Sequence, residues 1–165
     1  MVSDLYPSAS LYVSDIREDI LDELDRRFAL AGIHPQKVFC TELEQSLSAQ
    51  VAYSNLPSDG VDLIIADVPC SGSGTWGRAP EWLRIFDHEL IGEYQKRQIR
   101  IVSNLVQHLK PGAYLLYITC SVFRAENEEV VEALCDQTDL KLVVSQLISG
   151  VNTGGDHLFT ALLQI

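Results

Sequence analysis

The stretch DLIIADVPCSGSGTWGRAPE, residues 62–81, contains the features that decide the fold. An apolar run ends in Asp67 and is followed by Pro69, Cys70 and a loop of small residues. Unbroken apolar runs of this kind are typical of strands buried on both faces of a parallel sheet. We therefore expect a central strand at 61–67. The loop after it should lie at the carboxyl edge of the sheet, where open α/β sheets bind ligands.

The rest of the chain alternates between strand patterns and helix patterns. Strands are predicted at 11–15, 37–42, 61–67 and 113–119, and helices at 17–33, 89–109 and 125–136. Two more strands, 140–148 and 157–165, follow each other with only a turn region between them. This order predicts one α/β domain over residues 1–165, with a Rossmann-like doubly wound sheet and an antiparallel C-terminal hairpin.

Composition narrows the class of protein. An apolar content of 47% and a charged content of 21% are ordinary for a soluble globular domain. No apolar run approaches the roughly 20 residues that span a bilayer, and the first residues do not have the pattern of a secretory signal. The four cysteines form no Cys-x-x-Cys pair and the four histidines are scattered, so no metal site is predicted. We expect a cytoplasmic protein with reduced thiols.

The net charge of −11 argues against a freestanding nucleic-acid binder, because neutralising phosphates supplies much of that affinity. The sequence still allows a local basic face, since five basic residues fall between positions 78 and 100. These residues are Arg78, Arg84, Lys96, Arg97 and Arg100. A solvated helix flank is the alternative explanation for them.

Two cysteines follow consecutive predicted strands. Cys70 comes after 61–67 and Cys120 after 113–119, so a right-handed crossover should bring both to one rim with Asp67. Cysteine is also a common small residue of protein cores. For Cys40 and Cys135, which fall inside a strand and a helix, we prefer that structural explanation.

A thiol at this rim is compatible with several chemistries. A cysteine phosphatase needs five residues between its cysteine and arginine, whereas seven separate Cys70 from Arg78. A Cys/His hydrolase needs an imidazole as base, and His157 stays open for that role. The loop could also bind an anion through its backbone amides, although it lacks the lysine of a P-loop.

Two long motifs carry a resemblance to a known family. DVPCSGSGTWGRAPE (67–81) and YITCSVFRAENEEV (117–130) resemble the two signatures of the Sun/Fmu-type RNA (cytosine-5) methyltransferases, with Val68 in place of the common alanine. HLKPGAYLLYITCS (108–121) and GGDHLFTALL (154–163) are also similar to that family. The resemblance implies a class I S-adenosylmethionine-dependent methyltransferase that acts on ribosomal or transfer RNA.

The resemblance also implies roles for the residues at the rim. Cys120 would be the nucleophile that adds to carbon 6 of cytosine and so makes carbon 5 reactive. Cys70 would assist release of the covalent adduct, and Asp67 would contact or protonate the base. The implied RNA contacts are Arg78, Ser71 and Gly72, with the small loop admitting a flipped base.

S-adenosylmethionine is the cofactor that the resemblance implies. Asp15 resembles the acidic residue that hydrogen-bonds the ribose in nucleotide-binding α/β folds. Asp67 and Pro69 would line the same site, and Glu42 is a weaker candidate for the adenine side. No metal is implied.

The family's glycine-rich cofactor loop is not found in the sequence before Asp15, because MVSDLYPSASLYV has no glycine. We therefore expect a domain without its first strand, whose neighbours at 11–15 and 61–67 either pair with each other or accept a partner, such as a second copy of the chain. Two functional hypotheses follow. The chain is part of a methyltransferase that acts only in a complete domain, or it is a non-catalytic remnant that folds or dimerises.

Overall fold

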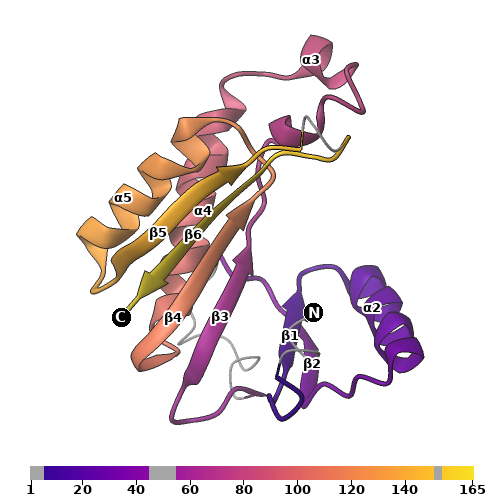
Figure 1. Cartoon of the computed structure of the whole chain (residues 1–165), viewed down its shortest axis with the longest axis vertical. Helices are drawn as coiled ribbons and strands as arrows, with labels where there is room; N and C mark the ends of the chain where they lie inside the picture. Colours follow the sequence, from indigo (N-terminus) through magenta and orange to yellow (C-terminus); the bar gives the residue numbers. More distant parts are fainter. Residues whose placement is uncertain (1–5, 45–54, 151–153) are drawn as a thin grey trace. The chain divides into compact units, whose positions relative to one another are not determined.

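The computed structural model describes residues 6–44, 55–150 and 154–165 (Figure 1). The chain divides into two compact units, Met1–Ser58 and Asp59–Ile165. No helix within the described ranges is long and apolar enough to cross a membrane. Nor does any cluster of three or more His, Cys, Asp or Glu residues in those ranges have a geometry that could hold a metal ion.

The first unit is a β–α–β element. Strand β1 (Tyr12–Asp15) pairs in parallel with β2 (Lys37–Cys40), and helix α2 (Glu18–Ala31) connects them. The helix ends at Gly32, whose φ of 66° lies in the left-handed region that glycine adopts without strain. Both strands and the helix occur where the sequence predicted them, with ends that differ by one or two residues. Asp15 is the last residue of β1.

The second unit contains a four-stranded sheet in the order β3-β4-β6-β5. Strand β3 (Val61–Asp67) runs parallel to β4 (Leu109–Thr119), while β6 (Leu158–Gln164) is antiparallel to β4 and to β5 (Lys141–Ile148). The predicted crossover and the predicted antiparallel hairpin are therefore confirmed.

Helices α4 (Leu90–Val106) and α5 (Glu128–Gln137) contact each other and pack on one face of this sheet (Figure 1). Alternate residues of the strands point toward them, because side chains of a strand alternate between its faces. The fully buried side chains of this layer include Val102, Leu115, Tyr117, Val130, Leu134, Phe159 and Leu163. The described part of the unit also contains three shorter elements: the 3-10 turns η3 (Ser73–Thr75) and η4 (Arg124–Glu126), and helix α3 (Trp82–Ile85).

The opposite face of the sheet corrects one expectation. The sequence predicted that β3 is buried on both faces, but Leu63 and Ile65 are 43% and 46% exposed. Tyr114 of β4 is paired with Leu63 and is 39% exposed. The apolar run therefore indicated a strand correctly, but it did not indicate that both faces are covered. Within β3 only Ala66, on the side of the helices, is buried.

Two element boundaries also differ from the prediction. Strand β4 begins at Leu109, so Pro111 and Gly112, which were expected to separate helix from strand, lie within it. The predicted helix 125–136 is divided into η4 and α5, and Glu126 in the first of these is fully buried. Within its own unit, the strand at 11–15 pairs with β2, and the strand at 61–67 pairs with β4.

Candidate active site

The two cysteine loops leave the sheet at the same level. Asp67, the last residue of β3, is in register with Ile118 of β4, and the Val68 N–H donates to the Ile118 carbonyl at 3.2 Å. Each of the two strands then leads into its loop, and the Cys70 and Cys120 sulfurs lie 3.3 Å apart. The predicted meeting of these two thiols at the carboxyl edge of the sheet is therefore observed.

The contact between the two sulfurs shifts the pKa values of the two thiols in opposite directions. With the proton on Cys70, its thiol donates to the Cys120 sulfur and lowers the pKa of Cys120 from 9.0 to about 7. Burial and the carboxylate of Asp67 oppose this shift. The same hydrogen bond, together with burial, raises the pKa of Cys70. Cys120 is therefore the thiol that is available as a thiolate near neutral pH, and the thiolate is the nucleophilic form of cysteine.

Backbone contacts hold the Cys70 loop against both neighbouring segments. The Gly74 N–H donates to the Cys120 carbonyl at 2.9 Å, and the Gly74 carbonyl accepts from the His157 N–H at 3.0 Å. A Cβ atom on Gly74 would overlap the His157 carbonyl and lie 2.9 Å from the Cys120 carbonyl oxygen. Position 74 thus needs glycine because two backbones approach it closely.

The other residues of the predicted site lie around this centre. Asp67 is exposed at the end of β3, and Gly72 has a φ of 70°, which allows the turn into η3. Pro69 accepts a hydrogen bond from the Gln98 side chain through its carbonyl at 2.9 Å. Arg78 is exposed, and its Nε donates to Asp156 at 2.8 Å.

Two predicted cofactor residues, Asp15 and Glu42, belong to the first unit. Asp15 accepts hydrogen bonds at 2.9–3.0 Å from the backbone and guanidinium of Arg17. The guanidinium contact holds the pKa of the Asp15 carboxyl below its usual value, so this side chain is an anion at neutral pH. Glu42 follows the end of β2 and is half-buried.

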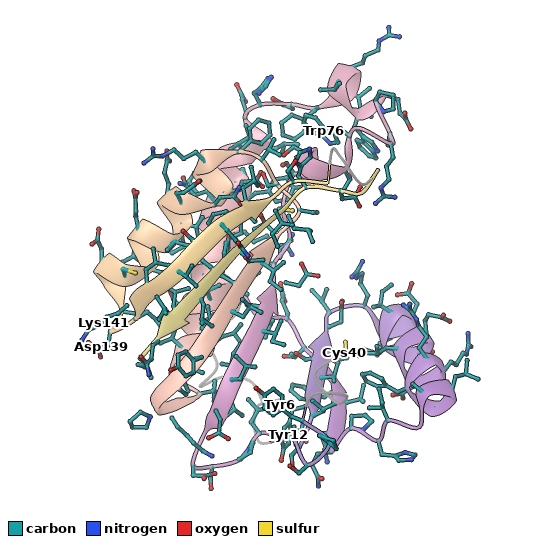
Figure 2. The ribbon with its side chains drawn as sticks, viewed as in Figure 1. Tyr6, Tyr12, Cys40, Trp76, Asp139 and Lys141 are labelled. Carbon is teal, nitrogen blue, oxygen red and sulfur yellow. The ribbon has the colours of Figure 1, made fainter. Side chains whose placement is uncertain are left out.

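Aromatic rings gather beside the cysteine loops. Trp76, which Figure 2 labels, lies 4.8 Å from the ring of Phe86 and 5.9 Å from that of Phe123 between centroids. Trp76 is half-buried in this cluster, whereas Trp82 on α3 is 51% exposed. Of the two tryptophans, only Trp82 presents about half of its surface to solvent.

The geometry argues against a Cys/His hydrolase. The hydrogen-bond partner of the Cys120 sulfur is a second thiol. The side chain of His157 makes no hydrogen bond to it among the described residues, and the Nδ1 atom of His157 is buried without a partner. An imidazole base for Cys120, which the sequence left open, is not in place.

Three residues that position the site were not predicted from the sequence. Gln98 lies in the middle of α4, Glu126 looked like part of a helix N-terminus, and Gly74 looked like one of several loop glycines. The side chains of Gln98 and Glu126 are fully buried. Glu126 and Gly74 carried a signal, since they lie within the motifs YITCSVFRAENEEV and DVPCSGSGTWGRAPE, whereas Gln98 lies in neither.

The fold is that of a class I S-adenosylmethionine-dependent methyltransferase. NSun6 from Pyrococcus horikoshii, solved with SFG, superposes with a TM-score of 0.81 at 17% identity, covering 99% of this chain and 43% of that one. An S-adenosylmethionine-dependent methyltransferase from Clostridium acetobutylicum gives a TM-score of 0.62 at 12% identity, over 99% and 78% of the two chains.

The sequence identifies the family within this class. Residues 3–161 match the family described as 16S rRNA methyltransferase RsmB/F, and the chain belongs to that family. Mouse tRNA (cytosine(72)-C(5))-methyltransferase NSUN6 is 31% identical over 122 residues, which is 67% of this chain and 24% of that protein. Ribosomal RNA small subunit methyltransferase B of Shewanella oneidensis is 37% identical over 128 residues, covering 68% and 29%. The chain thus spans about a quarter of the length of these relatives.

Gly74→Ala should separate the two loops. The added methyl group meets two carbonyl oxygens of the backbone, which cannot rotate away, so we expect a loss of about 1–3 kcal/mol in the free energy of unfolding. Urea denaturation measures it. Gly77→Ala is the matched control, because a Cβ atom at that position would have nothing within 4 Å. Equal stability of the two variants would contradict the close approach.

The reactivity of Cys120 should depend on Cys70. Alkylation of Cys120 by iodoacetamide, followed by peptide mass spectrometry, should rise with pH around a midpoint of about 7. Cys70→Ala removes the donor, so the midpoint should move up toward 9.0. The exposed Cys40 provides an internal reference in the same digest. A midpoint unchanged by Cys70→Ala would show that the hydrogen bond is not the cause.

Proposed function

We propose that this chain is the motif-bearing part of an RNA cytosine-5 methyltransferase and that Cys120 is its nucleophile. The observation that carries the proposal is the pair of thiols 3.3 Å apart at the carboxyl edge of the sheet. Membership of the RsmB/F family and relatives named as cytosine-5 methyltransferases support the same reaction.

The chemistry requires a thiolate because carbon 5 of cytosine is too electron-poor to attack a methyl donor. In the proposed reaction the Cys120 sulfur bonds to carbon 6, and the electrons of the C5=C6 bond make carbon 5 nucleophilic. Carbon 5 would then take the methyl group, as the bond from that group to the sulfonium sulfur of the donor breaks and leaves a neutral thioether. The lowered pKa of Cys120 supplies the thiolate at neutral pH.

Release reverses the addition. Transfer of the proton from carbon 5 to water returns its electron pair to the C5=C6 bond, and the bond from carbon 6 to the Cys120 sulfur breaks, so that Cys120 leaves as a thiolate. The Cys70 thiol lies next to the Cys120 sulfur, and we propose that Cys70 assists this release step. Asp67, exposed at the same edge, is assigned the contact with the base.

RNA is the proposed partner, and the relatives are named for both ribosomal and transfer RNA. We assign contacts with it to Ser71, Gly72 and the exposed Arg78, which lie in or just after the Cys70 loop. A flipped base needs such close access to the backbone.

The anionic Asp15 at the end of β1 fits the ribose hydroxyls of S-adenosylmethionine, since a carboxylate can accept both. Glu42, Asp67 and Pro69 are the other residues proposed to hold it. When bound, S-adenosylmethionine supplies an electrophilic methyl group. We propose that methyl transfer needs a complete domain that includes the family's glycine-rich cofactor loop, and that edge pairing with a second copy is one way in which β1 or β3 gains a further neighbour. The alternative is a chain without catalysis.

Calorimetric titration of this chain with S-adenosylmethionine separates these hypotheses. Saturable one-site binding by the monomeric chain would contradict the need for a complete domain. No binding, together with binding by the domain completed with a family segment that carries the glycine-rich loop, would support it. No binding by either form would favour the non-catalytic alternative.

In the completed domain, Cys120→Ser should abolish methyl transfer and covalent capture of RNA that contains 5-azacytosine. Cys70→Ala should leave protein trapped on RNA, because release fails. Cys40→Ser, at an exposed cysteine of the first unit, is the control and should behave as the unchanged protein. Denaturing gels show the adduct and labelled methyl groups show transfer. Transfer retained by Cys120→Ser would overturn its role.

A further inference from the structure

A carboxylate with no contact to solvent lies behind the two cysteines. Glu126 is 0% exposed and belongs to the turn η4, between β4 and α5. A buried carboxylate is costly unless hydrogen bonds compensate for lost water. Hydrogen-bond donors from three separate segments of the chain surround it.

One oxygen of Glu126 binds the segment after Cys70. Oε1 accepts from the Ser71 backbone N–H at 2.7 Å and, more weakly, from the Gln98 Nε2 at 3.4 Å. Ser71 is the residue next to Cys70 in the sequence. Gln98 also donates to the Pro69 carbonyl at 2.9 Å, so the residues on both sides of Cys70 are held.

The other oxygen joins the two loops. Oε2 accepts from the hydroxyls of Ser71 and Ser121, each at 2.5 Å. Ser121 directly follows Cys120. A single carboxylate therefore holds the residue after each cysteine, across a sequence separation of 55 positions on one side and 5 on the other.

Asn127 restrains the second loop from the opposite side. Its Nδ2 donates to the Ser121 carbonyl at 2.9 Å, and its Oδ1 accepts from the Thr119 hydroxyl at 2.6 Å. Thr119 and Ser121 flank Cys120, as Pro69 and Ser71 flank Cys70. The loops have no strand ladder at this point, so these side-chain contacts act together with the Gly74 backbone hydrogen bonds between the two loops.

We propose that Glu126 is a positioning residue that clamps the two cysteine loops and so sets the thiol-to-thiol contact on which the proposed function rests. It touches neither thiol in a hydrogen bond of its own and acts through Ser71 and Ser121. Charge-assisted hydrogen bonds to a carboxylate are the strong class in proteins, which suits a clamp between two loops.

Positioning and simple electrostatics predict opposite results. Removing a negative charge near a thiol favours the thiolate and lowers its pKa. Loosening the clamp instead removes the hydrogen bond from Cys70, so the pKa of Cys120 should rise. Glu126→Gln keeps the size of the side chain and an acceptor for the Ser71 N–H, and the serine hydroxyls can turn to accept from its amide.

The test is the pH profile of Cys120 alkylation in this chain, with circular dichroism to show that each variant is folded. Glu126→Ala should move the midpoint from about 7 toward 9.0. Glu126→Gln should leave it at about 7 or below. Glu132→Ala, at an exposed carboxylate of α5, is the control and should not change the midpoint. A folded Glu126→Ala protein with a midpoint of about 7 would overturn the proposal.

If Glu126→Ala does not fold, the pair Ser71→Ala and Ser121→Ala tests the same clamp from the donor side. The double variant should raise the midpoint, and an unchanged midpoint would overturn the proposal. This readout needs neither RNA nor cofactor. Failure of methyl transfer in the completed domain with the midpoints as expected would therefore contradict the proposed function and leave the clamp standing.

Discussion

The parallel pairing of β3 with β4 is the constraint on which the cysteine site depends. It puts Asp67 level with Ile118, so the chain leaves both strands at one edge and the two loops begin side by side. A shift by one residue would turn every side chain of β3 to the other face, because strand side chains alternate. Ala66 would leave the helix-covered layer, and Cys70 would no longer meet Cys120.

The parts of the structure that follow from short-range pattern could be predicted. Apolar runs located the strands, helical periodicity located α2 and α4, and the order of elements predicted a parallel pair followed by an antiparallel hairpin. Because consecutive parallel strands end at one edge, the meeting of Cys70 and Cys120 also followed from the sequence. Their roles followed only from the family motifs.

The parts that depend on distant partners could not be predicted. The run 61–67 is equally apolar whether one or both faces are covered, so its composition did not reveal the exposure of Leu63 and Ile65. In the sequence, Glu126 looked like an acidic residue at a helix N-terminus. Its role as a hydrogen-bond acceptor was not visible there, because its donors come from the distant positions 71, 98 and 121. Buried polar networks are assembled by tertiary structure, and no sequence period marks them.

The order of strands in the second unit also has a consequence for folding during synthesis on the ribosome. β6 lies between β4 and β5, although it is made after both. β5 exposes Leu142, Val143 and Val144 even in the finished sheet. Until 158–164 has emerged, β5 has no neighbour to pair with, and its apolar residues are those of an unpaired strand. Completion of the sheet therefore waits for β6, a contact of long sequence separation with β4.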